Sequence, residues 1–129
     1  GMAILPHMPE GLRGRKAVMD RYDAALAGLP VQRPSVPEGT GYNYAYYPVF
    51  LRSAAEREHV LATLAKGGVH GRRYFFPSLD ELPYVNGGAC PRSRDLSMRA
   101  LCLPLYPELE ADEVDRIAGL LRQAVADGL

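Results

Sequence analysis

The segment that begins at Arg72 carries the side chains best suited to binding a charged ligand. It reads Arg72, Arg73, Tyr74, Phe75 and Phe76, so two guanidinium groups stand beside three aromatic rings. A guanidinium donates parallel hydrogen bonds to phosphate oxygens, and a tyrosine can stack on a ring while its hydroxyl donates. On the residue types alone we favour a plainer interpretation, in which the two charges belong to a strand that reaches solvent.

The other reactive residue types form no recognisable catalytic or metal-binding pattern. Ser78 lies near Asp80 and His70 in the sequence, but the spacing does not define a catalytic triad. Cys90 and Cys102 are too few for a disulfide framework and too far apart for a close-spaced metal pair, so we expect two buried free thiols. The histidines are scattered, and we expect no metal site; they are His7, His59 and His70.

Length and composition indicate one domain. The chain has 129 residues, 47% apolar and 23% charged, which suits a single hydrophobic core. Fifteen basic residues balance fifteen acidic ones, so nothing favours a nucleic acid partner. No stretch approaches the roughly 20 apolar residues of a membrane span, and we expect a cytoplasmic protein without membrane contact. Gly1 before Met2 is typical of tag removal, so we expect the domain over residues 2–129.

The first half of the chain predicts a helix, a loop and a strand. Pro9 suits the first turn of a helix that runs toward Gly28, with an apolar stripe at near-helical spacing. Residues 29–41 are rich in proline and glycine and predict a connecting loop. Residues 42–51 are aromatic and predict a strand, with Pro48 placing it at an edge or a bulge. The residues expected on one face of this strand are Asn43, Ala45, Tyr47, Val49 and Leu51.

A second helix and strand are predicted to follow. Ser53 and Glu56 form the pattern of a capping box, which predicts a helix that ends at Gly67 and Gly68. Its expected inward residues are Val60, Leu61, Leu64 and Ala65. Residues 69–76 predict a strand that places Arg72, Tyr74 and Phe76 on one face and Arg73 on the other. Residues 78–91 predict an irregular loop with one helical turn near residues 79–82.

The last third predicts a short helix over residues 93–100, a strand over 101–106 and a long helix. This last helix has an apolar stripe of Val114, Ile117, Ala118, Leu121 and Val125. The order of elements predicts an α+β fold, with a small, three-stranded, mostly antiparallel sheet and helices packed mainly on one face.

Linked blocks of the sequence resemble the C-terminal small domain of the DegT/DnrJ/StrS family of sugar aminotransferases. The run of Arg, Arg, Tyr and Phe from Arg72 is similar to a subset that acts on nucleotide-linked oxo-deoxysugars. The resemblance covers the chain nearly end to end, in order and at matching distances. The blocks are residues 15–26, 43–49, 68–77, 90–91 with Ser93, and 101–106.

The resemblance implies that the cofactor, pyridoxal phosphate, binds outside this chain. In the family a lysine of the large domain forms the Schiff base and an aspartate pairs with the pyridinium nitrogen. Lys16 and Lys66, the two lysines, match neither motif, and nothing like the large domain precedes Lys16. We therefore expect neither a catalytic residue nor a cofactor-binding residue in this chain.

The resemblance also changes the interpretation of the arginine segment. In the family this strand end lies near the mouth of the active site, so Arg72, Arg73, Tyr74 and Phe76 are the expected substrate-binding residues, with a nucleotide sugar as the ligand. The first hypothesis is a stand-alone aminotransferase domain, inactive by itself, whose partner is a large-domain chain or further copies of itself. The alternative is a non-catalytic binding or assembly module, or a remnant, that keeps residual sugar-nucleotide binding.

Overall fold

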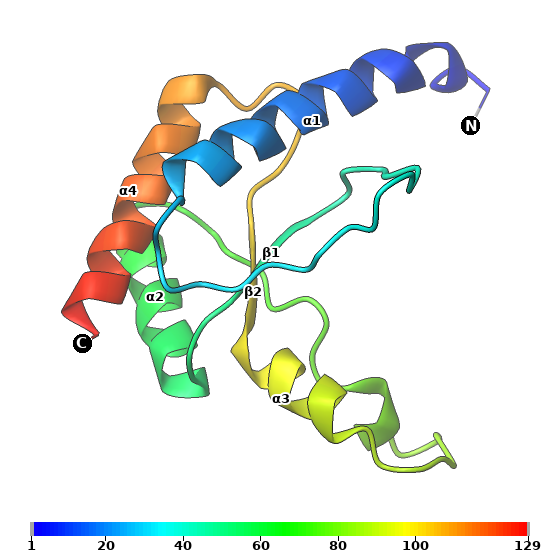
Figure 1. Cartoon of the computed structure of the whole chain (residues 1–129), viewed down its shortest axis with the longest axis vertical. Coiled ribbons are helices and arrows are strands. Elements are labelled where there is room, and N and C mark those ends of the chain that lie inside the picture. Colours follow the sequence, from blue (N-terminus) through cyan, green and yellow to red (C-terminus); the bar gives the residue numbers. More distant parts are fainter. Residues whose placement is uncertain (1, 129) are drawn as a thin grey trace.

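Two short antiparallel strands lie at the centre of the domain, between helices. The computed structural model describes residues 2–128, which form four α-helices, two strands and two 3₁₀ turns (Figure 1). Gly1, the predicted tag remnant, and Leu129 lie outside the described residues. In chain order the elements are η1 Leu5–His7, α1 Met8–Ala25, β1 Tyr47–Phe50, α2 Ala54–Lys66, η2 Leu79–Glu81, α3 Pro91–Arg99, β2 Ala100–Leu103 and α4 Ala111–Asp127.

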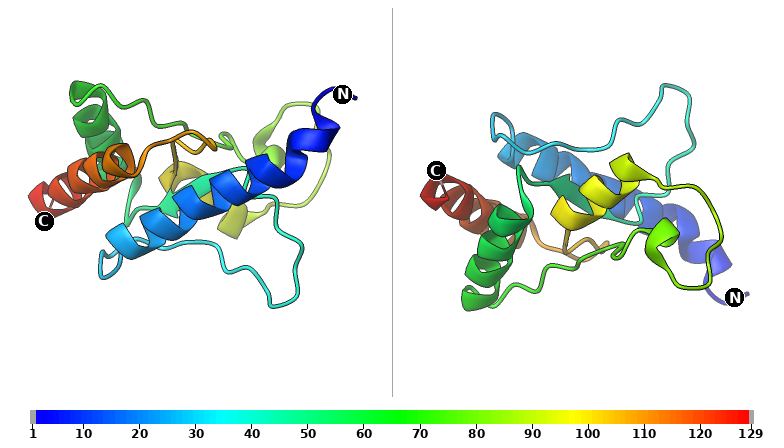
Figure 2. Two further views of the ribbon diagram at one scale, coloured as in Figure 1. Left: turned by 90° about the horizontal axis from the view of Figure 1, so that it is seen from above. Right: turned by 90° about the horizontal axis from the view of Figure 1, so that it is seen from below.

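The hydrophobic core lies between one face of the sheet and three helices. Tyr47 pairs with Leu103 and Val49 with Leu101, and all four side chains are buried in the core. Helices α1, α2 and α4 close this face, whereas α3 leads directly into β2 at the end of the sheet and, of these three helices, packs against α2 (Figure 1). The N-terminal part of α1 extends past the rest of the domain, away from the C-terminus (Figure 2).

The amphipathic helices follow the predicted pattern. All five residues of the predicted α4 stripe are buried, because a 3.6-residue period keeps them on one side of the helix. At the start of α2 the Ser53 hydroxyl accepts the Glu56 amide at 3.1 Å, as predicted, but the Glu56 carboxylate accepts the amide of Arg52 instead of that of Ser53. Ala65 is exposed, so its predicted inward position is wrong.

The third strand of the predicted sheet is not confirmed. Of residues 69–76, only Arg72 pairs with β2, through two backbone hydrogen bonds to Cys102. The chain turns at Tyr74 and Phe75 directly after this bridge, so no further ladder forms. Gln32 makes a similar single bridge to Phe50 on the outer edge of β1. The α+β class is confirmed, but the sheet has two strands with one isolated bridge on each side.

Both remaining strands are shorter than predicted. Tyr44 has a φ of 51°, which lies in the left-handed region and is incompatible with an extended strand. The strand therefore begins at Tyr47, and Asn43 and Ala45 do not share its core face. Pro104 ends β2 because it has no amide hydrogen, and its carbonyl accepts the hydroxyl of Tyr22 at 3.0 Å.

At the C-terminal end of each of the four α-helices among the described residues, one backbone carbonyl accepts a hydrogen bond from an arginine outside that helix. The last carbonyls of a helix lack intrahelical partners and carry partial negative charge, so a guanidinium is a favourable donor there. Arg57 is only 2% exposed and donates from Nε to the carbonyl of Met98 at 3.1 Å. The four pairs are Arg122 to Ala25 (α1), Arg116 to Gly67 (α2), Arg57 to Met98 (α3) and Arg52 to Val125 (α4).

Two glycines of α1 are expected to respond oppositely to alanine. At Gly14 an added Cβ would lie 2.8 Å from Cβ and 3.0 Å from Cα of Pro107, which the rigid ring cannot relieve. At Gly11 the nearest atom is 3.9 Å away. Gly11→Ala should raise the free energy of unfolding by about 0.5–1 kcal/mol through helix propensity. Gly14→Ala should lower it by about 1–2 kcal/mol through overpacking.

Urea unfolding of the two variants, followed by circular dichroism, measures this difference directly. Equal stabilisation by both substitutions would contradict the close packing of α1 against Pro107.

Candidate functional site

Two adjoining hollows lie against the side of the strands that is turned away from the core. We call the first, of about 300 Å³, the polar hollow and the second, of about 320 Å³, the apolar hollow. The polar hollow is lined by Ala45, Tyr46, His70, Arg72, Tyr74 and residues 102–106. The apolar hollow is lined by Tyr46, Pro48, Phe50, Tyr74, Phe75, Ser93, Leu96, Ser97, Ala100 and Cys102.

Arg72 supplies the positive charge of the polar hollow. Its backbone is fixed by the two hydrogen bonds to Cys102, and its Nη1 donates to the hydroxyl of Tyr74 at 2.8 Å. It takes part in none of the ion pairs between described residues. The remaining guanidinium donors and the Tyr74 hydroxyl proton are therefore available to an anionic ligand.

The predicted substrate-binding residues separate into two groups. Arg72 and Tyr74 both line the polar hollow, as expected for alternate residues on one face. Arg73 instead places its guanidinium carbon 3.8 Å from the ring centre of Phe76, and neither of these residues lines either hollow. The turn at Tyr74 and Phe75 explains the separation, because it removes Phe76 from the expected face.

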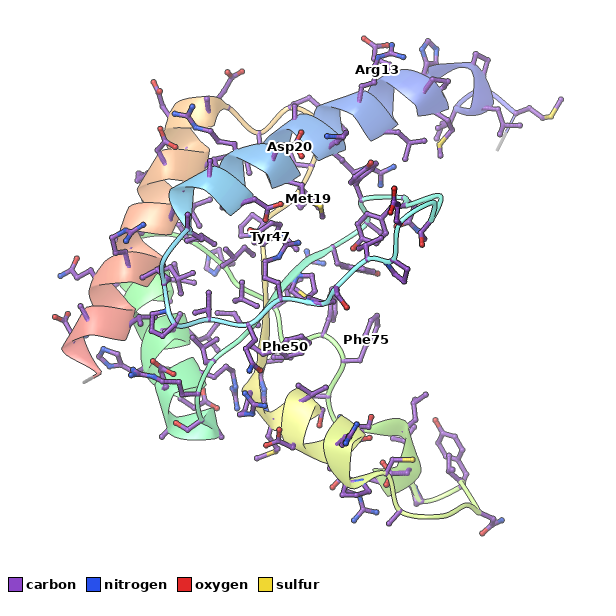
Figure 3. All side chains as sticks on the ribbon, in the orientation of Figure 1. Arg13, Met19, Asp20, Tyr47, Phe50 and Phe75 are labelled. Atoms are coloured by element: carbon purple, nitrogen blue, oxygen red, sulfur yellow. The ribbon has the colours of Figure 1, made fainter. Side chains whose placement is uncertain are left out.

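An aromatic cluster joins the two hollows. The ring of Tyr46 meets those of Tyr74 and Phe75 edge-on, with centres 5.5 and 5.8 Å apart, and Tyr74 stacks on Phe75 at 5.3 Å. Figure 3 shows Phe75 on the side of the strands away from α2 and α4, whereas Tyr47 lies beneath α1. The sequence placed Tyr46 only within the strand predicted over residues 42–51, because alternation does not reveal which segment folds back against it.

The position of Tyr46 depends on the turn that precedes it. The Asn43 side-chain oxygen accepts the amide of Ala45 at 3.1 Å, which supports the left-handed backbone of Tyr44. This turn ends two residues before β1, and Tyr46, which lies between them and faces away from the buried Tyr47, lines both hollows.

Hydrogen bonds to the Asp80 carboxylate hold α3 in place, and residues of α3 line one side of the apolar hollow. The Ser78 hydroxyl lies 2.6 Å from one Asp80 oxygen, while the Cys90 amide and Arg94 Nε donate to the other at 2.8 and 2.7 Å. The Ser78 hydrogen bond, followed by those of Cys90 and Arg94, lowers the pKa of Asp80 to about 2. Asp80 is therefore a charged structural anchor at neutral pH, and Ser78 and His70 form no triad with it.

The two cysteines differ in their surroundings. Cys102 is buried, as predicted, and burial raises the pKa of its thiol. Cys90 is exposed at the start of α3, so its predicted burial is wrong. The long loop before α3 brings Cys90 to the surface.

Neither lysine fits the cofactor. A lysine forms a Schiff base only as the neutral amine, after it has lost a proton. Nζ of Lys16 lies 2.6 Å from the Asp20 carboxylate, which favours the charged form. That hydrogen bond raises the pKa of Lys16 above its ordinary value. Lys66 ends α2 and lines neither hollow. Neither lysine therefore belongs to the candidate site formed by the two hollows.

The fold and the hollows define a small α+β domain that presents a guanidinium and a phenolic hydroxyl beside an aromatic cluster. The sequence pattern of the DegT/DnrJ/EryC1/StrS aminotransferase family matches residues 1–122, and the chain belongs to this family. The family resemblance inferred from the sequence is thereby confirmed.

The relatives are sugar aminotransferases much longer than this chain. A dTDP-4-amino-4,6-dideoxy-D-glucose transaminase of Shigella dysenteriae is 28% identical over 95% of the chain, which spans 35% of that enzyme. The structure of an aminotransferase, TlmJ, of Streptoalloteichus hindustanus superposes with a TM-score of 0.88 at 27% identity, covering 98% of this chain and 35% of TlmJ. The structure of DesI with its TDP-sugar product gives 0.88 at 30% identity, covering 99% of this chain and 34% of DesI. The chain therefore spans about a third of these enzymes.

No helix among residues 2–128 combines the length and the hydropathy that crossing a membrane requires.

Proposed function

We propose that this chain is the C-terminal domain of a pyridoxal-phosphate-dependent nucleotide-sugar aminotransferase and that it supplies part of the substrate site. The observation that carries the proposal is the pair of Arg72 and Tyr74 in the polar hollow, where the guanidinium has no carboxylate partner among the described residues. The relatives' names support the ligand class, since the Shigella enzyme acts on a dTDP-sugar and DesI was solved with a TDP-sugar.

In this proposal the residues of the polar hollow bind and orient the substrate. The fork of Arg72 holds diphosphate oxygens, and the Tyr74 hydroxyl donates a further hydrogen bond to the same ligand. His70 lies on the same wall and adds a donor for a phosphate or a sugar hydroxyl. Pyridoxal phosphate, bound in the remaining two thirds of the enzyme, would supply the electron sink for amino transfer. Since neither Lys16 nor Lys66 fits the cofactor, we propose that the chain is inactive by itself.

Exposed apolar residues support a macromolecular partner. Met2, Ile4 and Leu5 are 85%, 65% and 61% exposed, in the part of the chain that leads into the projecting end of α1. Apolar side chains gathered in this way commonly mark an interaction surface. We propose that the rest of the aminotransferase, on the same or a separate chain, covers this surface. Assembly with further copies of the same chain is the alternative.

A ligand titration tests the proposed substrate site. Thymidine diphosphate added to the ¹⁵N-labelled chain should shift the backbone amides of Arg72, Tyr74 and Cys102, whereas the amides of α4 should stay unchanged. Nuclear magnetic resonance detects even millimolar affinity, which is appropriate for a site that lacks its remaining walls. Shifts confined to residues outside both hollows would contradict the proposal.

A further inference from the structure

The loop that joins η2 to α3 carries an asparagine followed by a glycine. Asn86 and Gly87 are both exposed, in a segment that belongs to no helix or strand and that projects from the domain beside α3 (Figure 1). The backbone amides of residues 86–89 donate to no other backbone group of the described residues. A segment without such hydrogen bonds rearranges at little free-energy cost. The Gly87 amide can therefore change its direction relative to the Asn86 side chain.

Hydrogen bonds hold the two ends of this loop. The Val85 amide donates to the carbonyl of Leu82 at 3.0 Å, and the Cys90 amide donates to the Asp80 carboxylate at 2.8 Å. Mobility without these contacts is thus confined to residues 86–89, and a chemical change there acts on a loop whose far end is tied to the start of α3.

The fold does not require a glycine at position 87. Gly87 does not adopt the left-handed φ that favours glycine, and a Cβ added there would meet only Cγ1 of Val85, at 4.0 Å. Gly88 likewise has room for a Cβ, with nothing within 4 Å. What the missing Cβ of Gly87 does provide is an amide nitrogen that no side chain shields. Alanine at either position should therefore keep the fold and change only that shielding.

We propose that Asn86 is a site of spontaneous deamidation, a modification that does not depend on the proposed function. The Gly87 amide nitrogen attacks Cγ of Asn86, and the new N–Cγ bond forms as the Cγ–Nδ2 bond breaks. The departing group takes up the amide proton and leaves as ammonia. Water then opens the resulting succinimide, with its hydroxyl on the opened carbonyl carbon and its proton on the ring nitrogen. Opening at Cγ gives aspartate, and opening at the backbone carbonyl gives isoaspartate.

The modification changes both the charge and the length of the loop. The chain has fifteen basic and fifteen acidic residues, so a sixteenth acidic group takes the formal net charge from zero to −1. Isoaspartate also adds Cβ of Asn86 to the backbone path between Asp80 and Cys90. The Cys90 amide should therefore change its nuclear magnetic resonance shift in an aged sample. Asn86 lines neither hollow, so thymidine diphosphate binding at Arg72 should stay unchanged.

Asn43, the other asparagine of the chain, is an internal control. Its side-chain oxygen accepts the amide of Ala45 at 3.1 Å, which holds the side chain in a turn. The next residue is Tyr44, whose Cβ hinders the approach of its own amide nitrogen, and its φ is 51°. Trypsin separates the two sites, because cleavage at arginine places Asn43 in the peptide 22–52 and Asn86 in the peptide 74–92.

The test follows both peptides by liquid chromatography and mass spectrometry. The folded chain is incubated at mildly alkaline pH and digested, with an unincubated sample as the reference. Peptide 74–92 should gain the mass of deamidation at least about tenfold faster than peptide 22–52, the ratio given by a barrier difference of about 1.4 kcal/mol. The product should elute as separate aspartate and isoaspartate forms. Gly87→Ala should slow the reaction by a similar factor, whereas Gly88→Ala should leave its rate unchanged.

Each alternative result contradicts the inference. Equal rates in the two peptides of the unsubstituted chain would overturn it, and this comparison needs no variant to fold. Equal slowing by Gly87→Ala and Gly88→Ala would show that the Gly87 amide is not the nucleophile. Deamidation of Asn86 that occurs in urea but not in the folded chain would show that the loop protects the site.

Discussion

Arg57→Ala is expected to lower the free energy of unfolding by about 3 kcal/mol, because it removes a part-buried hydrogen bond to a helix-end carbonyl and leaves a cavity where the buried arginine side chain was. Arg57 is 2% exposed, donates to the Met98 carbonyl at 3.1 Å and pairs with Glu58 at 2.7 Å. Glu58 reaches solvent, so its charge is not stranded when Arg57 is removed. The loss therefore comes mainly from Met98 and from the packing of the Arg57 stem between α2 and α3.

Arg122→Ala is the matched control for Arg57→Ala. Arg122 also donates to a helix-end carbonyl, that of Ala25 at 2.6 Å, but its hydrogen bond is exposed to solvent. Water can replace an exposed donor, so we expect a loss below about 1 kcal/mol. Denaturant unfolding of both variants measures the difference. Equal losses would show that burial of Arg57 contributes nothing beyond the capping hydrogen bond.

Arg72→Gln is expected to weaken thymidine diphosphate binding by about 10- to 100-fold, because it removes charge-assisted hydrogen bonds to the diphosphate. Arg73→Gln should change binding less than about threefold, since Arg73 packs on Phe76 and lines neither hollow. The two substitutions change the net charge equally, so general electrostatic attraction affects both alike.

Binding constants from nuclear magnetic resonance titrations compare the two arginine variants. Equal weakening would mean that the arginine run acts as a diffuse positive patch, in which Arg72 has no specific role. Selective weakening by Arg73→Gln would restore the sequence-based assignment of Arg73 and overturn the separation of the two arginines.

The helices were predictable because their patterns are local. The α4 stripe is buried because the apolar residues recur at helical spacing, and Ser53 starts α2 through a hydrogen bond within the same turn. The burial of Arg57 could not be predicted in this way. Its partner, Met98, is 41 residues away, and no local pattern distinguishes it from the exposed arginines.

The strands were less predictable, because short turns decide where pairing stops. Residues 42–46 have strand-forming side chains, yet the hydrogen bond from Ala45 to Asn43 and the left-handed Tyr44 end the extended run. The turn at Tyr74 and Phe75 has the same effect on residues 69–76. Alternation did place Arg72 and Tyr74 together correctly.

The hollows themselves depend on contacts between distant segments. Tyr46 contacts Tyr74 and Phe75 because β1 and the segment at Arg72 pair with opposite sides of β2. The sequence therefore indicated the charged end of the candidate site, but neither its aromatic wall nor the α3 side of the apolar hollow.

Borohydride trapping tests most directly the proposal that pyridoxal phosphate binds to the remainder of the aminotransferase and not to this chain. The chain is incubated with pyridoxal phosphate near neutral pH, reduced with borohydride, digested and analysed by mass spectrometry. We predict no site-specific adduct on Lys16 or Lys66 and no internal aldimine absorbance, because the Lys16 amine is held charged by Asp20 and Lys66 lines neither hollow. A stoichiometric adduct on either lysine, accompanied by that absorbance, would contradict the proposal that the cofactor is bound elsewhere in the enzyme.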